Sequence, residues 1–434
     1  MRFLSKEHMN KVMDKPLRLM VNRSFLLTLM ALFVVNFLFE YYYTSFIIPT
    51  YKENGIILDF NWLKYLEGKF WLLILMAGAC LLNRSTQFIS SLFVFLLLLL
   101  FLPAHIIYAY SDGMPKAFYS VLTFFVIFGF LGSQRIKLKT VFMPEWIKYT
   151  LLLAIMFIML VPVVMDFKLN ISPQALKLQN IYDVREVFKL KSSGFTDYTF
   201  WWLAKAVLPV LLVFSMIRRD PKVIVLSLLI LAYLFLISGH KSVYATPLLI
   251  LFYYFFGKTY NDKIKISIIA ILVLLLLINI PDFYLQRPMF KSLIVRRVFF
   301  VPAILNEFYF DFFDHNHLFL SHSVFSGLTE YPYDVMPTYL IGEHYFDKPE
   351  MSSNVGIVAD GFMNFGYIGV VVYSTLFSFI MVLLNSIKLN LRYFGIFVFY
   401  MMIFRGTAFL TAFLTHGFWL LLIFAFIVIP KHDS

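Results

Sequence analysis

The chain has 434 residues, of which 61% are hydrophobic and only 14% are charged. Soluble domains hold about 45–50% apolar and about 25% charged residues, so this composition excludes an ordinary soluble globular protein. The net charge of +12 could suggest nucleic-acid binding, but basic cytoplasmic loops of a membrane protein explain it better. The single cysteine, Cys80, excludes a disulfide framework and a cysteine-rich metal site.

Apolar stretches recur along the whole chain and predict an all-α, polytopic membrane helix bundle. About 20 apolar residues are needed for a perpendicular crossing, and several of these stretches are shorter, so one or two could be re-entrant. A basic segment precedes the first stretch and no small-residue cleavage site follows it, which predicts a retained first helix. The expected spans are 25–47, 65–82, 88–109, 117–132, 149–166, 199–217, 223–238, 243–257, 265–280, 364–386, 393–412 and 414–429.

The charges of the connecting segments predict the orientation. Connections on the side of the N-terminus all contain Lys or Arg, whereas the short connections on the other side contain few, such as Lys116 and Lys241. The positive-inside rule therefore predicts cytoplasmic termini and places two long loops, 167–198 and 281–363, on the outer face. No internal repeat or soluble domain interrupts the pattern, so residues 1–434 form one membrane domain, with a partly helical, functional loop at 281–363.

Several cations in apolar surroundings are candidates for an anion site. Arg287, Arg296 and Arg297 lie in "YLQRPMFKSLIVRRVFFVPAILNEF", where a guanidinium favours an anionic partner and fits phosphate oxygens. If this segment is one helix, Arg296 and Arg297 point about 100° apart, so only one of them faces a ligand. For the other outer cations, solvated loop charge is the alternative.

Further candidate residues lie inside or beside expected spans. Arg405, in "YMMIFRGTAFL", is ionisable within the membrane, which is by default a hypothesis of function. His240 and Lys241 occupy the short outer turn "SGHKSVYATP", where Lys can bind phosphate and His can move protons. The alternative for this turn is an ordinary polar connection.

The carboxylates give the candidates for catalysis. In "SSNVGIVADGFMNFGYIGV", Asp360 and Asn364 are expected to share a face with Tyr367 at the outer start of a membrane helix. This position makes Asp360 a candidate general base. Asn364 and Tyr367 are candidate contacts for the glycan. Glycines in this stretch permit close approach of backbone or ligand. A structural carboxylate is the alternative for Asp360, and Glu307 is a second candidate.

Three histidines in the long loop invite a metal interpretation. Their H-x-H-x4-H spacing, at His315, His317 and His322, matches no helical zinc motif. We interpret them as loop histidines and expect neither a metal nor a cofactor.

Three stretches together resemble the bacterial oligosaccharide repeat-unit polymerases of O-antigen and capsule assembly, the Wzy-type polymerases. They are "SGHKSVYATPL" (238–248), "RRVFFVPAILNEFYFDFF" (296–313) and "SSNVGIVADGFMNFGYIGV" (352–370), in the family's order and with its long outer loop. The resemblance in topology covers nearly the whole chain, and that in motifs covers the C-terminal half.

The resemblance implies a metal-independent glycosyltransferase of the bacterial inner membrane, with a fold similar to that of O-antigen ligases and other GT-C enzymes. Such enzymes move a glycan from undecaprenyl diphosphate to a new lipid-linked repeat unit at the periplasmic face, and a chain-length regulator is a possible partner. The family's diphosphate-binding cations correspond to Lys241, Arg296 and Arg297, with His240 beside them. Many relatives have Arg in the short turn where this chain has "HK". The resemblance supplies no catalytic base, and Asp360 is our own hypothesis.

Three other functions of membrane proteins are alternatives to the polymerase. A flippase for lipid-linked oligosaccharides should show inverted repeats and ionisable groups near the bilayer midplane, whereas the polar groups here gather at the outer rim. A glycosyltransferase using polyprenyl monophosphate sugars would resemble its relatives in an acidic pair in the first outer loop, which this chain lacks. A membrane acyltransferase could use His105 or His416, although such histidines are more often packed.

Overall fold

The computed structural model describes residues 23–134, 143–168, 181–327, 329–387 and 389–429, together with positions 136, 138 and 171. Within these residues the chain is helical and has no β-strand, only an isolated bridge between Asp59 and Ser111. The basic N-terminal segment, residues 430–434, and parts of the connections expected at 132–148 and 167–198 lie outside the described residues.

Nine helices in the described part of the chain are long and apolar enough to cross a membrane, which confirms an all-α, polytopic membrane protein. The expected spans 243–257, 393–412 and 414–429 are helical too, but their helices are shorter than the other nine. The nine are Arg23–Asn54, Trp62–Ser85, Gln87–Tyr110, Pro115–Gly132, Glu145–Phe167, Gly194–Arg218, Pro221–Ser238, Tyr260–Tyr284 and Ile357–Asn385.

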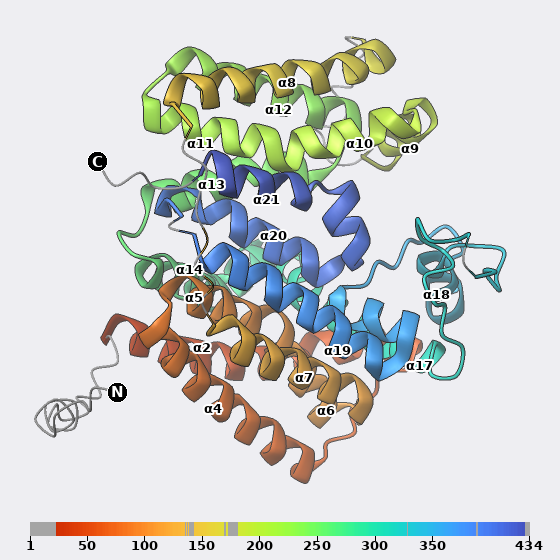
Figure 1. Cartoon of the computed structure of the whole chain (residues 1–434). Helices are drawn as coiled ribbons and strands as arrows, with labels where there is room; N and C mark the ends of the chain where they lie inside the picture. Colours follow the sequence, from red (N-terminus) through yellow and green to blue (C-terminus); the bar gives the residue numbers. More distant parts are fainter. Residues whose placement is uncertain are drawn as a thin grey trace, which may run out of the picture.

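Figure 1 labels most of the helices, and their numbers follow the chain. Up to residue 218 they are α2 (Arg23–Tyr42), α3 (Ile48–Tyr51), α4 (Trp62–Ser85), α5 (Gln87–Leu96), α6 (Leu102–Tyr110), α7 (Pro115–Gly132), α8 (Glu145–Phe167), α9 (Ile181–Lys191), α10 (Gly194–Trp202) and α11 (Leu208–Arg218). After it come α12 (Pro221–Ser238), α13 (Lys241–Phe255), α14 (Tyr260–Leu277), α15 (Asn279–Tyr284), α16 (Met289–Lys291), η6 (Ser292–Phe300), α17 (Val301–Phe312), α18 (Pro337–Phe346), α19 (Ile357–Asn385), α20 (Phe394–Gly406) and α21 (Phe418–Ile427).

Local sequence signals explain where several of these helices begin and end. The side chain of Asn61 accepts hydrogen bonds from the backbone at the start of α4, and Thr86 and Asp220 do the same for α5 and α12. Such side chains satisfy the first N–H groups of a helix, which have no partner within it. Gly239 ends α12 at a φ of 62°, a left-handed conformation that glycine adopts without strain.

The helices pack in layers (Figure 1). In Figure 1, α8–α12 form one end of the molecule, α2–α7 form the other, and α13, α19, α20 and α21 lie between them. The continuous α5–α6 segment is buried along its whole apolar window. Large apolar side chains such as Leu63, Phe130 and Ile158 instead lie exposed on outer helices, which suits contact with lipid rather than with water.

The long connection between α15 and α19 is partly helical, as expected from the sequence. Its first half, α16–η6–α17, is one continuous helical segment that enters the bundle rather than covering it. The ring of Phe299 lies 4.7 Å from that of Phe39, and Phe300 stacks on Tyr43 at 5.1 Å. This segment therefore places Arg296 partly inside the molecule and leaves Arg297 exposed, while α18 lies at the edge of the molecule (Figure 1).

Candidate functional site

The site forms where α19 breaks. Phe365 and Gly366 have non-helical backbone angles, and Gly366 has a φ of 60°. The two parts of α19 then pack tightly, because a Cβ on Gly369 would lie 1.9 Å from the carbonyl oxygen of Gly361. The expected helix at 364–386 thus begins earlier, at Ile357, and its glycines permit close backbone approach.

The break corrects one expectation about this helix. Asp360 and Asn364 lie before it and are buried, whereas Tyr367 lies after it and is 50% exposed. Tyr367 therefore does not share their face, because two non-helical residues rotate the second part of the helix relative to the first.

Asp360 is buried, and backbone and side-chain donors hold both of its carboxylate oxygens. The Phe409 N–H donates to Oδ2 at 2.7 Å, and the Asn364 Nδ2 donates to Oδ1 at 3.0 Å. Gly356, at the N-cap of α19, is so close to the C-terminal end of α20 that a Cβ there would lie 2.0 Å from the carbonyl oxygen of Arg405. Asp360 therefore fastens the start of α19 to the segment that follows α20.

Asn364 connects this carboxylate to the long loop. Its Oδ1 accepts the Leu320 N–H at 2.9 Å, and its carbonyl oxygen accepts the Phe319 N–H at 3.0 Å. Phe319 and Leu320 have φ values of 47° and 64°, a left-handed conformation that is strained for residues with side chains. Hydrogen bonds to the side chain and the backbone of this one residue thus fix the loop beside Asp360.

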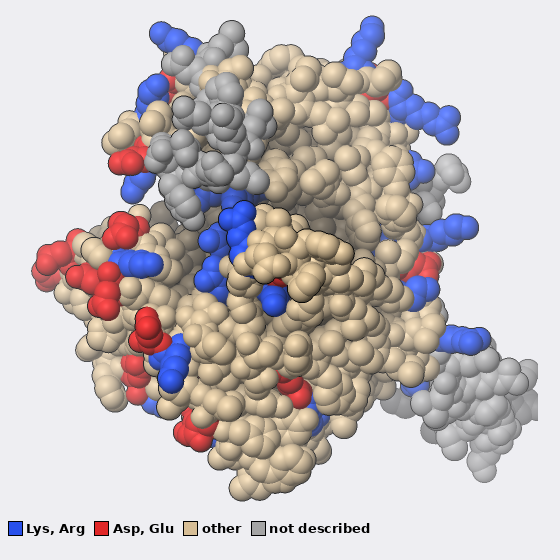
Figure 2. Space-filling view, turned by 180° about the vertical axis from the view of Figure 1, so that it is seen from behind, with Lys and Arg blue, Asp and Glu red and all other residues tan. Residues whose placement is uncertain are grey.

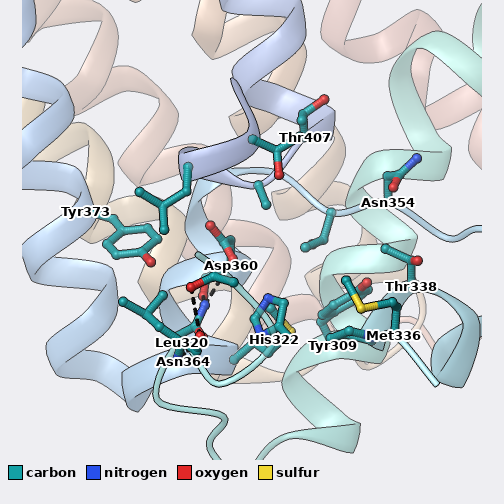
Figure 3. A pocket seen from close by; sticks show the side chains of 17 residues that line it. Tyr309, Leu320, His322, Met336, Thr338, Asn354, Asp360, Asn364, Tyr373 and Thr407 are labelled. Atoms are coloured by element: carbon teal, nitrogen blue, oxygen red, sulfur yellow. Dashed lines mark hydrogen bonds between the residues drawn. The ribbon is translucent and has the colours of Figure 1, made fainter. Parts of the chain in front are cut away.

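A cavity of about 150 Å³ lies beside Asp360 and Asn364. Figure 3 shows that side chains from the loop, from α17 and α19, and from the segment after α20 surround it. Its lining residues are Tyr309, Leu320, His322, Ser323, Met336, Pro337, Thr338, Asn354, Val355, Asp360, Met363, Asn364, Tyr373, Thr407, Ala408, Leu410 and Thr411.

His322 lines the cavity, although the sequence analysis interpreted it as an ordinary loop histidine. Its Nδ1 atom is buried and has no hydrogen-bond partner. Burial lowers the pKa of the His322 imidazole to about 4, which keeps the ring neutral at physiological pH. Nothing in the H-x-H-x4-H spacing separates His322 from His315 and His317, because the fold of the loop decides which histidine reaches the cavity.

Three of the expected cations lie near one another at the α16–η6–α17 segment. The Arg405 guanidinium donates a hydrogen bond to the carbonyl oxygen of Val298, one residue beyond Arg297. Arg296 is half-buried, with its Nε atom buried and unpartnered, whereas Arg297 is exposed. The two neighbours therefore face different surroundings, as expected from their spacing on a helix.

Charge is unevenly distributed over the surface. Figure 2 shows lysine and arginine side chains gathered around a hollow in the middle of one face, next to the layer formed by α8–α12. Acidic side chains gather instead at the edge that carries α18. The hollow is thus the more attractive part of this face for an anionic group.

The other expected residues do not line the cavity. Glu307 is buried on α17 and accepts the Met114 N–H at 2.8 Å, and burial raises the pKa of its carboxyl to about 8. Lys241 is half-buried at the start of α13, and Arg287 is exposed beyond α15.

His240 is packed among aromatic rings. Its ring lies 4.8 Å from Trp201 and 5.7 Å from Phe188, and its Nδ1 atom is buried and unpartnered. Burial, with Arg185 and Lys205 nearby, lowers the pKa of His240 to about 3. The turn that holds His240 and Lys241 is therefore separate from the cavity at Asp360.

Among the described residues, no group of three or more His, Cys, Asp or Glu side chains gathers where it could hold a metal ion. The chain matches no protein-family model, and no curated protein or solved structure shows significant similarity to it.

Proposed function

We propose that this protein is a polymerase of lipid-linked oligosaccharide repeat units, a metal-independent glycosyltransferase of a bacterial inner membrane. Both termini then lie in the cytoplasm, and the 281–363 region, with the cavity, lies on the periplasmic side. The substrates are undecaprenyl-diphosphate-linked glycans, the overall architecture is GT-C-like, and a chain-length regulator is a partner. The three stretches that resemble Wzy-type polymerases motivate this proposal.

The surroundings of the Asp360 carboxylate support the proposal independently of the resemblance. The buried carboxylate of Asp360 lies at the wall of the cavity, and its two hydrogen bonds fix its orientation without using all of its lone pairs. A general base needs this combination of fixed geometry, restricted water and a free acceptor site. A carboxylate with only a structural role does not need the neighbouring cavity.

The proposed step is a single transfer. A hydroxyl oxygen of the acceptor sugar attacks the anomeric carbon of the donor glycan, and the bond from that carbon to the diphosphate oxygen breaks. Asp360 takes the hydroxyl proton, and the electron pair of the broken bond leaves on undecaprenyl diphosphate. Arg296 and Arg405 stabilise the charge that develops on the phosphate oxygens, because fixed cations act most strongly where charge forms in the transition state.

Deletion of the gene tests the function. Loss of a polymerase leaves single repeat units on the final acceptor. Complete loss of surface glycan, with lipid-linked units kept inside the cell, would instead identify a flippase and overturn the proposal.

Cysteine labelling tests the orientation. In a chain with Cys80→Ser, a membrane-impermeant thiol reagent should modify Ser326→Cys, which is exposed in the long loop, in intact spheroplasts. It should modify Gln134→Cys, exposed after α7, only after lysis. The reverse pattern would place the cavity on the cytoplasmic side.

A further inference from the structure

The size of the cavity at Asp360 limits what it can hold. Its volume is about 150 Å³. An engineered protein cavity of about 150 Å³ holds one benzene molecule, so this volume is on the scale of a single six-membered ring. Its wall combines rings and apolar side chains, such as Tyr309, Tyr373 and Met363, with polar groups such as Asn354 and Thr407. A sugar ring, which has apolar faces and a polar rim, matches this mixture.

His322 is the polar group on this wall whose partner is missing. Its Nδ1 atom is buried without a hydrogen bond, and leaving such an atom unpaired is unfavourable. The neutral ring has one donor and one acceptor, so it can bind a hydroxyl in either sense. The strained backbone at Phe319 and Leu320, held by Asn364, brings His322 to the same cavity as Asp360.

We propose that this cavity is the subsite for one pyranose ring of the acceptor glycan, and that His322 binds a hydroxyl of that ring while Asp360 receives the attacking hydroxyl. The inference rests on the proposed function and adds a residue that determines specificity. A site that hydrogen-bonds a sugar hydroxyl rejects the sugar that lacks it, because the buried partner is then left unpaired. Asn364 acts as a positioning residue, since it bonds to both Asp360 and the His322 loop.

Direct sugar binding tests the subsite. The purified protein in detergent is titrated with free D-glucose, D-galactose, D-mannose, L-rhamnose, N-acetyl-D-glucosamine and N-acetyl-D-galactosamine, and saturation-transfer NMR reports binding. At least one sugar should bind the wild type. His322→Leu should weaken this binding about tenfold, as expected for a lost hydrogen bond at a buried group, and His322→Asn should retain more of it. Ala408→Phe, which fills the cavity, should abolish binding.

His315→Leu is the matched control. Its side chain is 91% exposed in the same loop, so binding should remain at the wild-type level. Equal thermal stability of the variants shows that they are folded. The subsite is overturned if none of the six sugars binds the wild type, or if His322→Leu and Ala408→Phe bind as well as the wild type does.

The two proposals fail in different ways. Polymerisation is measured separately with lipid-linked repeat units. Sugar binding that depends on His322, without polymer from the wild type, would defeat the proposed function and leave a sugar site. Normal polymer from both cavity variants would defeat the subsite and leave the polymerase.

Discussion

The cavity at Asp360 and the turn at His240 both place a polar side chain beside apolar helices, but their surroundings differ. At Asp360, hydrogen bonds from Phe409 and Asn364 hold the carboxylate next to an open volume. At His240, the rings of Trp201 and Phe188 pack against the imidazole. The sequence made both regions candidates for the same reason, because each has a polar group at the expected outer end of a membrane helix.

The difference shows what turns a polar residue into a candidate site. A ligand can reach a group only where the neighbouring side chains leave space, and a group is useful only where its orientation is fixed. The Asp360 region meets both conditions, whereas aromatic packing occupies the space at His240. The following predictions test this contrast, beginning with the largest expected effect.

Replacing the Asp360 carboxylate should lower turnover more than any other substitution. Asp360→Asn keeps the shape but cannot take a proton, and loss of a positioned general base lowers the rate by roughly 10²–10⁴. Turnover of lipid-linked repeat units by the purified variant, at equal folded concentration, measures this. Turnover within about threefold of wild type would remove Asp360 from the mechanism, because a base contributes far more.

Exchanging Asp360 and Asn364 distinguishes a catalytic role of the carboxylate from a structural one. Asp360→Asn leaves two amide donors facing each other, because Asn364 already donates to this side chain. Combining it with Asn364→Asp allows residue 360 to donate and residue 364 to accept, while the Phe409 N–H and the Leu320 N–H keep acceptors. The double variant should recover thermal stability but not turnover. Recovery of both would favour a structural carboxylate.

The cations should have the next largest effects. Arg296→Ala removes a charge-assisted contact worth about 1.5–3 kcal/mol, which corresponds to roughly 10- to 150-fold in diphosphate affinity. Arg297→Ala should have less effect because this side chain is exposed. Arg405→Ala should also lower thermal stability, since it loses the bond to the Val298 carbonyl. The KM for lipid-linked substrate measures the first two effects.

Lys241→Ala tests whether the cation beside His240 contributes to diphosphate affinity as these arginines do. A decrease in affinity equal to that of Arg296→Ala would show that the turn takes part in diphosphate binding. Full-length polymer from all four single variants would rule the cationic site out.

Glu307 is another buried carboxyl, outside the cavity, and should affect stability rather than catalysis. Its pKa in the folded protein is raised to about 8, so the folded state holds the proton that the unfolded chain releases near pH 4.5. Stability should therefore fall as pH rises towards 8, by about 2–3 kcal/mol between pH 6 and pH 8. Thermal unfolding of the wild type against Glu307→Gln measures this, and equal pH dependence would contradict it.

The smallest effect is expected at His240. His240→Gln should leave turnover within about threefold of wild type, because loss of a group outside the reacting site removes no proton transfer. The same turnover assay measures it. A decrease as large as that of Asp360→Asn would contradict the contrast between the two regions and make His240 part of the site.

Much of the fold was predictable from the sequence. Nine of the expected spans correspond to helices of sufficient length and apolarity, because a crossing needs a long apolar stretch that is visible in any window of residues. The different burial of Arg296 and Arg297 was also predictable, since helical spacing separates neighbours in direction.

The site was only partly predictable. Asp360 and Asn364 do share a buried region, but the break at Phe365 and Gly366 removed Tyr367 from it. A glycine in an apolar stretch is compatible with a straight helix, so the break depends on contacts with other parts of the chain. Glu307 and His240 were singled out with Asp360, yet their neighbours place them elsewhere.

The sequence by itself thus determined the membrane architecture and the chemical types of the candidate groups, because apolar length and residue identity are local properties. The tertiary structure alone decided that His322, Asp360 and Thr407 surround one cavity. These residues come from a loop, a broken helix and the end of another helix, and no sequence spacing relates them. Backbone approach at Gly356 and Gly369, and the hydrogen bonds of Asn364, bring them together.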